Sequence, residues 1–164
     1  MGNSGGSLAI RSTARLADLM DAAGFTDVGE ATPPAAGWQF AEFGDAAGRS
    51  LAHLVTATGA AAIVVNYLDS DVGFVQGAAP DGSGWRGLLD RETAAGYDIP
   101  VDRYPVAPAL SGALAWSAAA GLTPDEPLVR RALTESAVFA EQLTALLFAG
   151  LGIPGTAEDE LHAP

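Results

Sequence analysis

The sequence has no cysteine, no lysine and only two histidines among its 164 residues. The absence of cysteine excludes disulfide bonds, thiolate nucleophiles, iron–sulfur clusters and zinc held by cysteine. Without lysine, the chain can form neither a lysine Schiff base nor a phosphate-binding loop of the Walker type. Several of the side chains that most often carry out reactive chemistry in proteins are therefore missing.

Positive charge is scarce as well. All eight basic residues are arginine, and they face 20 acidic residues, which gives a net charge of −12 at neutral pH. This charge repels phosphate backbones and anionic membrane surfaces, so we expect neither nucleic acid nor a membrane as a partner. It favours cationic ligands or a basic protein partner and raises the rate of association with them. An acidic surface also keeps a protein soluble, so the charge alone does not identify a partner.

Long apolar runs are absent too. The longest apolar stretches, such as 60–65 and 145–151, are too short to span a bilayer. The N-terminal residues carry no basic residue ahead of an apolar segment, which does not fit a secretory signal. We therefore expect a cytoplasmic protein.

The length is that of one ordinary domain. Residues 1–11 are rich in glycine and serine at their start and are predicted to form a flexible leader. Residues 155–164 are polar and acidic and are predicted to be a disordered tail. A single domain is predicted over residues 12–154.

Hydrophobic periodicity and turn residues divide this domain into helices and strands. The predicted elements are a helix at 12–23, a strand at 38–43, a helix at 49–58, a hairpin at 62–78, a short helix or third strand at 88–95, and helices at 108–120 and about 124–149. The hairpin has β-branched and aromatic runs on both sides of Asp69-Ser70-Asp71. The predicted fold class is therefore α+β, with a small, partly antiparallel sheet packed against three to four helices.

The last helix has the strongest start signal in the chain. Thr123-Pro124-Asp125-Glu126 supplies a capping residue, a proline for the first turn and an acid three residues on. Apolar residues then recur at helical spacing up to Gly150. They cover more of the helix circumference than a small monomer needs, which indicates a face for self-association.

The segment from Gly82 to Gly87 reads Gly-Ser-Gly-Trp-Arg-Gly and fits the dinucleotide-binding pattern G-x-G-x-x-G. That pattern needs a strand that leads directly into a helix, so that the pyrophosphate sits on the helix N-terminus. Here Pro80 and Asp81 intervene and the preceding strand belongs to a hairpin, so we expect no cofactor and interpret 80–87 as a glycine-rich loop. Trp85 either fills the edge of the core or forms a contact surface, and we favour the core.

Asp69 and Asp71 place two carboxylates on one tight turn. An EF-hand loop beginning at Asp69 would need a glutamate at its twelfth position, which is Pro80, so no metal site is predicted. Aspartate and serine at such a turn also satisfy backbone groups through short side-chain hydrogen bonds. His53 and the nearby Ser50 lack an evident acid, and no nucleophile elbow occurs, so no catalytic triad is predicted.

Two functions remain open from the sequence. The first is a non-enzymatic, acidic binding module, of an accessory or immunity type, that docks a basic protein partner or associates with itself. Its candidate contact residues are Asp69, Asp71, Trp85 and Arg86, because a cation beside an aromatic ring is common at interfaces. The alternative is a small-ligand-binding or metal-binding enzyme in which the carboxylates of Asp69, Asp71 and Glu92 converge near Trp85 and Arg86.

Overall fold

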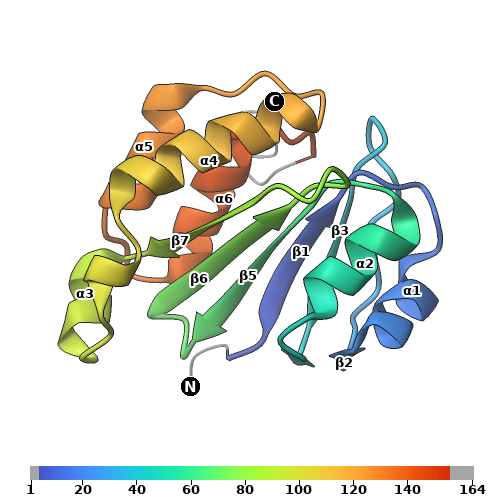
Figure 1. The fold of residues 1–164 in the computed structure, drawn as a ribbon. Coiled ribbons are helices and arrows are strands. Elements are labelled where there is room, and N and C mark those ends of the chain that lie inside the picture. The colour runs from blue at the N-terminus through green and yellow to red at the C-terminus, as the bar shows by residue number, and fades with distance from the viewer. Residues whose placement is uncertain (1–3, 156–164) are drawn as a thin grey trace, which may run out of the picture.

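The computed structural model describes residues 4–155, which form a five-stranded antiparallel sheet with helices on both faces (Figure 1). The strand order is β3-β1-β5-β6-β7, with every neighbouring pair antiparallel. The strands are β1 (Gly6–Ile10), β3 (Gln39–Phe43), β5 (Ala62–Leu68), β6 (Val72–Ala78) and β7 (Gly84–Leu89), and β2 (Phe25–Thr26) pairs separately with β4 (Asp45–Ala46). The predicted α+β class and the predicted hairpin are confirmed.

The helices lie in two layers. They are α1 (Leu16–Ala23), α2 (Ser50–Thr58), α3 (Arg91–Gly96), α4 (Val106–Ala119), α5 (Glu126–Thr134) and α6 (Ala140–Gly150), with a short 3₁₀ turn at Val101–Arg103. Successive side chains of a strand point to opposite faces of the sheet. In β5, Ala62 and Val64 pack with α1 and α2, whereas Ile63 and Val65 pack with α4, α5 and α6. Both faces of the central strand are therefore buried, which explains its continuous apolar run.

The predicted flexible leader is wrong for its second half, because residues 6–10 form the strand β1. This strand lies between β3 and β5, and Leu8, Ala9 and Ile10 are completely buried. A Cβ atom at Gly6 would lie 2.7 Å from the backbone oxygen of Val65, so the small residue permits the close pairing. Hydrogen bonds to two neighbours, rather than local propensity, make this short segment a strand. Of the predicted tail at 155–164, all but Gly155 lies outside the described residues.

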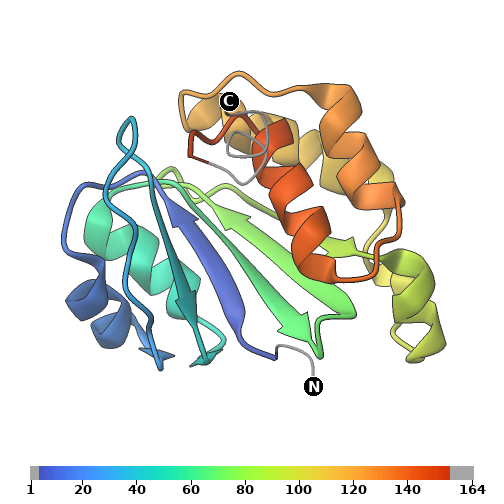
Figure 2. The same cartoon turned by 180° about the vertical axis from the view of Figure 1, so that it is seen from behind.

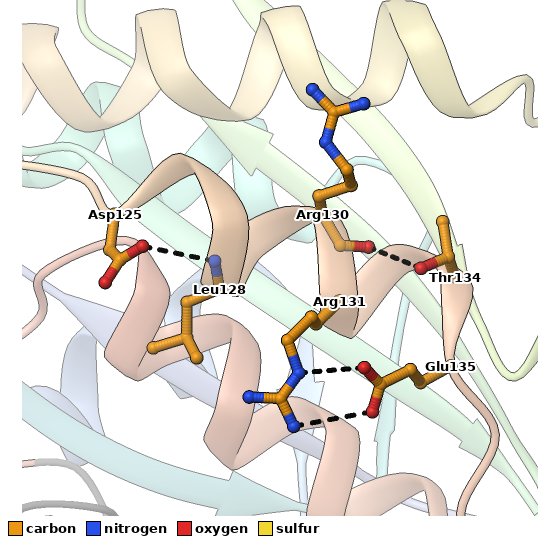
Figure 3. A network of polar contacts seen from close by, with 6 residues as sticks. All are labelled: Asp125, Leu128, Arg130, Arg131, Thr134 and Glu135. Carbon is orange, nitrogen blue, oxygen red and sulfur yellow. Dashed lines mark hydrogen bonds and ion pairs between the residues drawn. The ribbon is translucent and has the colours of Figure 1, made fainter.

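The helix predicted at about 124–149 is present as two helices, α5 and α6, separated by residues 135–139. A helix begins near the predicted start signal, but its cap is Asp125 and not Thr123, since Asp125 accepts a hydrogen bond from the amide of Leu128 at 3.2 Å (Figure 3). At the other end, Arg131 turns toward Glu135 and forms an ion pair at 2.8 Å, while Arg130 points away from that pair (Figure 3).

A contact with α3 accompanies the interruption between the two helices. The amide of Ala137 donates to Oδ2 of the buried Asp90 at 3.4 Å, instead of to a carbonyl of its own helix. The next helix, α6, begins after Phe139, whose amide donates to the side-chain oxygen of Gln142 at 3.0 Å. A buried carboxylate from a distant segment thus takes the place of a helical acceptor.

The predicted loop at 80–87 is also different in part, because Gly84–Leu89 is the strand β7. Both alternatives for 88–95 are partly realised, since the end of β7 and most of α3 fall within it. The loop was predicted because of its glycines, among them Gly84 and Gly87. In the structure Gly87 lies against Leu133 and Ala109, where a side chain would hold the helices away from the sheet.

Candidate functional site

The four candidate contact residues do not share one site. Asp69 and Asp71 lie in the turn between β5 and β6, whereas Trp85 pairs with Gly77 near the far end of β6. Gly77 is five residues from Val72, where the turn ends, which corresponds to about 16 Å along the strand. The predicted convergence of the loop carboxylates on Trp85 and Arg86 is therefore wrong.

Trp85 and Arg86 also point to opposite faces of β7. Trp85 is 8% exposed and packs in the core formed with α4, α5 and α6, so the interpretation that it fills the core edge is supported. Its indole N–H is buried and has no hydrogen-bond partner among the described residues. The guanidinium carbon of Arg86 lies 5.1 Å from the centre of the Tyr104 ring, a cation–π contact on the other face. Both side chains thus have structural roles.

The turn that carries Asp69 and Asp71 connects two other segments. Oδ2 of Asp71 accepts a hydrogen bond from the hydroxyl of Tyr97 at 2.5 Å, next to α3. The backbone oxygen of Ser70 accepts from the amide of Ala140 at 2.7 Å, and its hydroxyl donates to Oε2 of Glu141 at 2.8 Å. The turn therefore brings the C-terminal end of α3 and the start of α6 to one end of the sheet.

The large hydrophobic side chains that are exposed in residues 4–155 gather around this turn. Leu68 precedes it, Tyr97 bonds to it, and Val138 and Phe139 come immediately before Ala140. Val138 is 76% exposed and Phe139 is 54% exposed. We use the name turn-end surface for the set Leu68, Asp69, Asp71, Glu92, Tyr97, Val138 and Phe139.

Acidic side chains lie beside the apolar ones on this surface. Oε2 of Glu92 accepts a hydrogen bond from the hydroxyl of Ser136 at 3.3 Å, which places Glu92 beside the segment that leads to Val138. Hydrogen bonding to Asp71 raises the pKa of Tyr97 above its ordinary value, and the negative charges of Asp71 and Asp69 add to that effect. The structure thus brings Glu92 to the same end as the two aspartates, away from Trp85.

A second candidate site is a cavity of about 530 Å³ between α6, the strands β1 and β3, and the loop at 29–32. None of the helices in residues 4–155 lies over β1 and β3 on this side, as Figure 2 shows from behind. Phe40, Ala145 and Phe148 supply apolar walls, and the ring centres of the two phenylalanines are 6.1 Å apart. No local pattern in the sequence indicates this cavity, because its walls come from six separate segments.

Hydroxyl groups also line the cavity. The Tyr67 hydroxyl donates to Oγ1 of Thr144 at 2.8 Å and lies 3.1 Å from Oγ of Ser7. Thr144 in turn donates to the backbone oxygen of Ala140 at 3.3 Å. Burial raises the pKa of Tyr67 above its ordinary value, and the charges of Glu141 and Glu42 act in the same direction. A tyrosine within the apolar run at 62–68 is a signal for such a partner, because a buried phenol needs a hydrogen bond.

Glu141 lies in the first turn of α6. One of its carboxylate oxygens accepts from Ser70, whereas Oε1 is buried and has no hydrogen-bond partner among residues 4–155. Glu30 and Glu42 also line the cavity, and both are exposed residues. The cavity thus combines an apolar wall with three acidic side chains.

Comparison of the chain with protein families, curated proteins and solved structures found no match. Within residues 4–155, no three His, Asp or Glu side chains are arranged to hold a metal ion. No helix in that range has both the length and the apolar composition needed to cross a membrane.

Proposed function

We propose that this protein is a non-enzymatic binding module that docks a basic protein segment on its turn-end surface. The observation that carries the proposal is the gathering of Leu68, Tyr97, Val138 and Phe139 around a turn with two aspartates. Exposed aromatic and aliphatic side chains that lie together are typical of interaction sites. The surrounding acids select a partner that carries arginine or lysine next to apolar side chains.

The charges of the surface support a basic partner rather than a second copy of the chain. Among the salt bridges formed within residues 4–155, none includes Asp71 or Glu92. The guanidinium of Arg91, which begins α3, donates to the backbone oxygens of Tyr104 and Val101 and does not pair with these acids. Two copies that met through this surface would bring like charges together, which opposes self-association.

A peptide selection tests the proposal. Peptides that bind the protein are selected from a random library, and their affinities are measured by calorimetry at low and at high salt. We expect the selected peptides to combine arginine or lysine with aromatic or aliphatic residues. Replacing both Val138 and Phe139 by serine is expected to weaken their binding by about tenfold or more, because truncated hot-spot residues have effects of this size.

Charge variants separate a local contact from general attraction. Asp69→Asn with Asp71→Asn is expected to weaken binding and to reduce its dependence on salt. Asp18→Asn with Asp21→Asn makes the same change in charge on α1 and serves as the matched control, with little expected effect. Selected peptides that are acidic, a failure to select any peptide, or equal effects of the two charge variants would contradict the proposal. Circular dichroism establishes that each variant is folded.

A further inference from the structure

The cavity between α6 and the strands β1 and β3 is separate from the turn-end surface and has the size of a small-molecule site. Its volume of about 530 Å³ falls in the range of pockets that hold organic ligands. Such sites combine apolar walls with a few polar groups that fix the orientation of the ligand. Here Phe40 and Phe148 form the apolar part, and Ser7, Tyr67 and Glu141 form the polar part.

The directions of the hydrogen bonds determine what the polar part offers to a ligand. The phenol of Tyr67 has a single proton, which it donates to Thr144. In the 3.1 Å contact between Ser7 and Tyr67, the serine hydroxyl must therefore be the donor. The oxygen of Ser7 keeps its lone pairs and can accept a hydrogen bond, but its proton is already engaged.

Glu141 adds an acceptor of greater strength. Its side chain lines the cavity with a carboxylate, one oxygen of which accepts from the hydroxyl of Ser70. Glu30 and Glu42 line the same cavity, and no arginine of residues 4–155 does so. Both the hydrogen-bonding pattern and the charge therefore disfavour an anion and favour a ligand that donates from a cationic group.

We propose that this cavity binds a small organic amine, with its ammonium group at Glu141 and Ser7 and its apolar body against Phe40 and Phe148. The ammonium group donates to Oγ of Ser7 and lies beside the carboxylates of Glu141, Glu30 and Glu42, whose negative charge attracts it. A charge-assisted hydrogen bond of this kind is stronger than one between neutral groups. The apolar walls select an aromatic or aliphatic body over a purely polar one.

Binding of matched small molecules tests this inference. Phenethylamine, 4-phenylbutylamine and hexylamine are the cationic probes, and 2-phenylethanol and phenylacetate are the neutral and anionic counterparts. Affinities are measured by calorimetry and by chemical-shift changes in nuclear magnetic resonance spectra. We expect saturable binding of at least one amine. The affinity of 2-phenylethanol is expected to be lower by about tenfold or more, and phenylacetate is not expected to bind, because neither can form the charged hydrogen bond.

Two variants locate the binding. Glu141→Gln is expected to weaken amine binding by about tenfold, whereas Glu126→Gln, which changes a glutamate in the first turn of α5, leaves it unchanged. Ala145→Phe fills the cavity without changing charge and is expected to abolish binding, so the test does not depend on one variant. No saturable binding of any amine, equal binding of the three chemical classes, or equal effects of the two glutamine variants would overturn the inference. A failure of amine binding would leave the peptide-binding test intact, because the small-molecule measurements on the unmodified protein do not involve the turn-end surface.

Discussion

Gly112 of α4 lies so close to Trp85 of β7 that a Cβ atom on the glycine would be 2.4 Å from the Cβ atom of the tryptophan. On the neighbouring strand, a Cβ atom at Gly77 would lie 2.3 Å from the indole nitrogen. The ring is therefore enclosed by two positions that must remain without a side chain. Trp85 and these glycines together fix how closely α4 approaches the sheet.

Gly112→Ala is expected to destabilise the protein by about 1–3 kcal/mol, because the added methyl group overpacks the helix–sheet interface. Gly96→Ala at the end of α3 is the matched control, since its Cβ would meet no atom within 4 Å. That change is expected to be neutral or to stabilise by about 1 kcal/mol or less, because alanine favours the helix. Urea unfolding measures both, and an equal loss of stability in the two variants would refute the packing argument.

Asp90 joins α3 to the segment between α5 and α6. It is 1% exposed, caps α3 by accepting from the amide of Thr93 at 3.2 Å, and accepts from the amide of Ala137 with its other oxygen. Its backbone is left-handed, with a φ of 63°. Asparagine tolerates this conformation and keeps one acceptor oxygen, whereas alanine provides neither.

Asp90→Ala is therefore expected to lower the free energy of unfolding by about 2–4 kcal/mol, through the lost cap and the unpaired amide of Ala137. Asp90→Asn is expected to lower it less. Asp125→Ala removes the exposed cap of α5 and should lower it by about 1 kcal/mol. Hydrogen exchange at the Ala137 amide provides a second measurement. If Asp90→Ala and Asp125→Ala have equal effects, Asp90 acts only as a local cap.

The sequence predicted correctly those elements that are determined by residues close together in the chain. The hairpin at 62–78 follows from two apolar runs and a turn that aspartate and serine can adopt with positive φ. The capping sequence at 123–126 predicted that a helix starts there, although the residue that caps α5 is Asp125 and not Thr123. The interruption at 135–139 depends on Asp90, which is 47 residues away from Ala137, and no local pattern contains that information.

The candidate sites depend even more on distant contacts. The cavity exists because β1 pairs with both β3 and β5, which brings Ser7, Phe40 and Tyr67 to one face of the sheet. The sequence identified Asp69, Asp71 and Glu92 as acids in loops, but not the exposed hydrophobic residues that surround them. Val138 and Phe139 fall within the range predicted as one continuous helix at about 124–149, and both are exposed where that helix is interrupted.

The hydrogen bond from Tyr97 to Asp71 makes a prediction about titration. Because the phenol donates to a carboxylate, the folded protein holds the Tyr97 proton more tightly than the unfolded chain does, and the pKa of Tyr97 is raised. The stabilising effect is therefore complete below the ordinary tyrosine pKa of 10.0 and is lost as the pH rises through the raised value. We expect Asp71→Asn to lower the pKa of Tyr97, measured by nuclear magnetic resonance, and the distant change Asp18→Asn to leave it nearly unchanged. A similar shift in both variants would show that net charge, not the hydrogen bond, determines the pKa.

The position of β1 inside the sheet, between β3 and β5, predicts a large effect of Leu8→Ala. Leu8 is completely buried and packs with the helices α1 and α2, so its truncation is expected to destabilise the protein by about 2–5 kcal/mol in urea unfolding. Val138→Ala removes apolar atoms from a residue that is 76% exposed, and we expect a change within about 0.5 kcal/mol. A flexible leader predicts no effect of Leu8→Ala, because a mobile segment makes no persistent contacts. The unfolding free energies of the two variants therefore distinguish an interior strand from a flexible leader. A loss for Leu8→Ala no greater than that for Val138→Ala would contradict the strand.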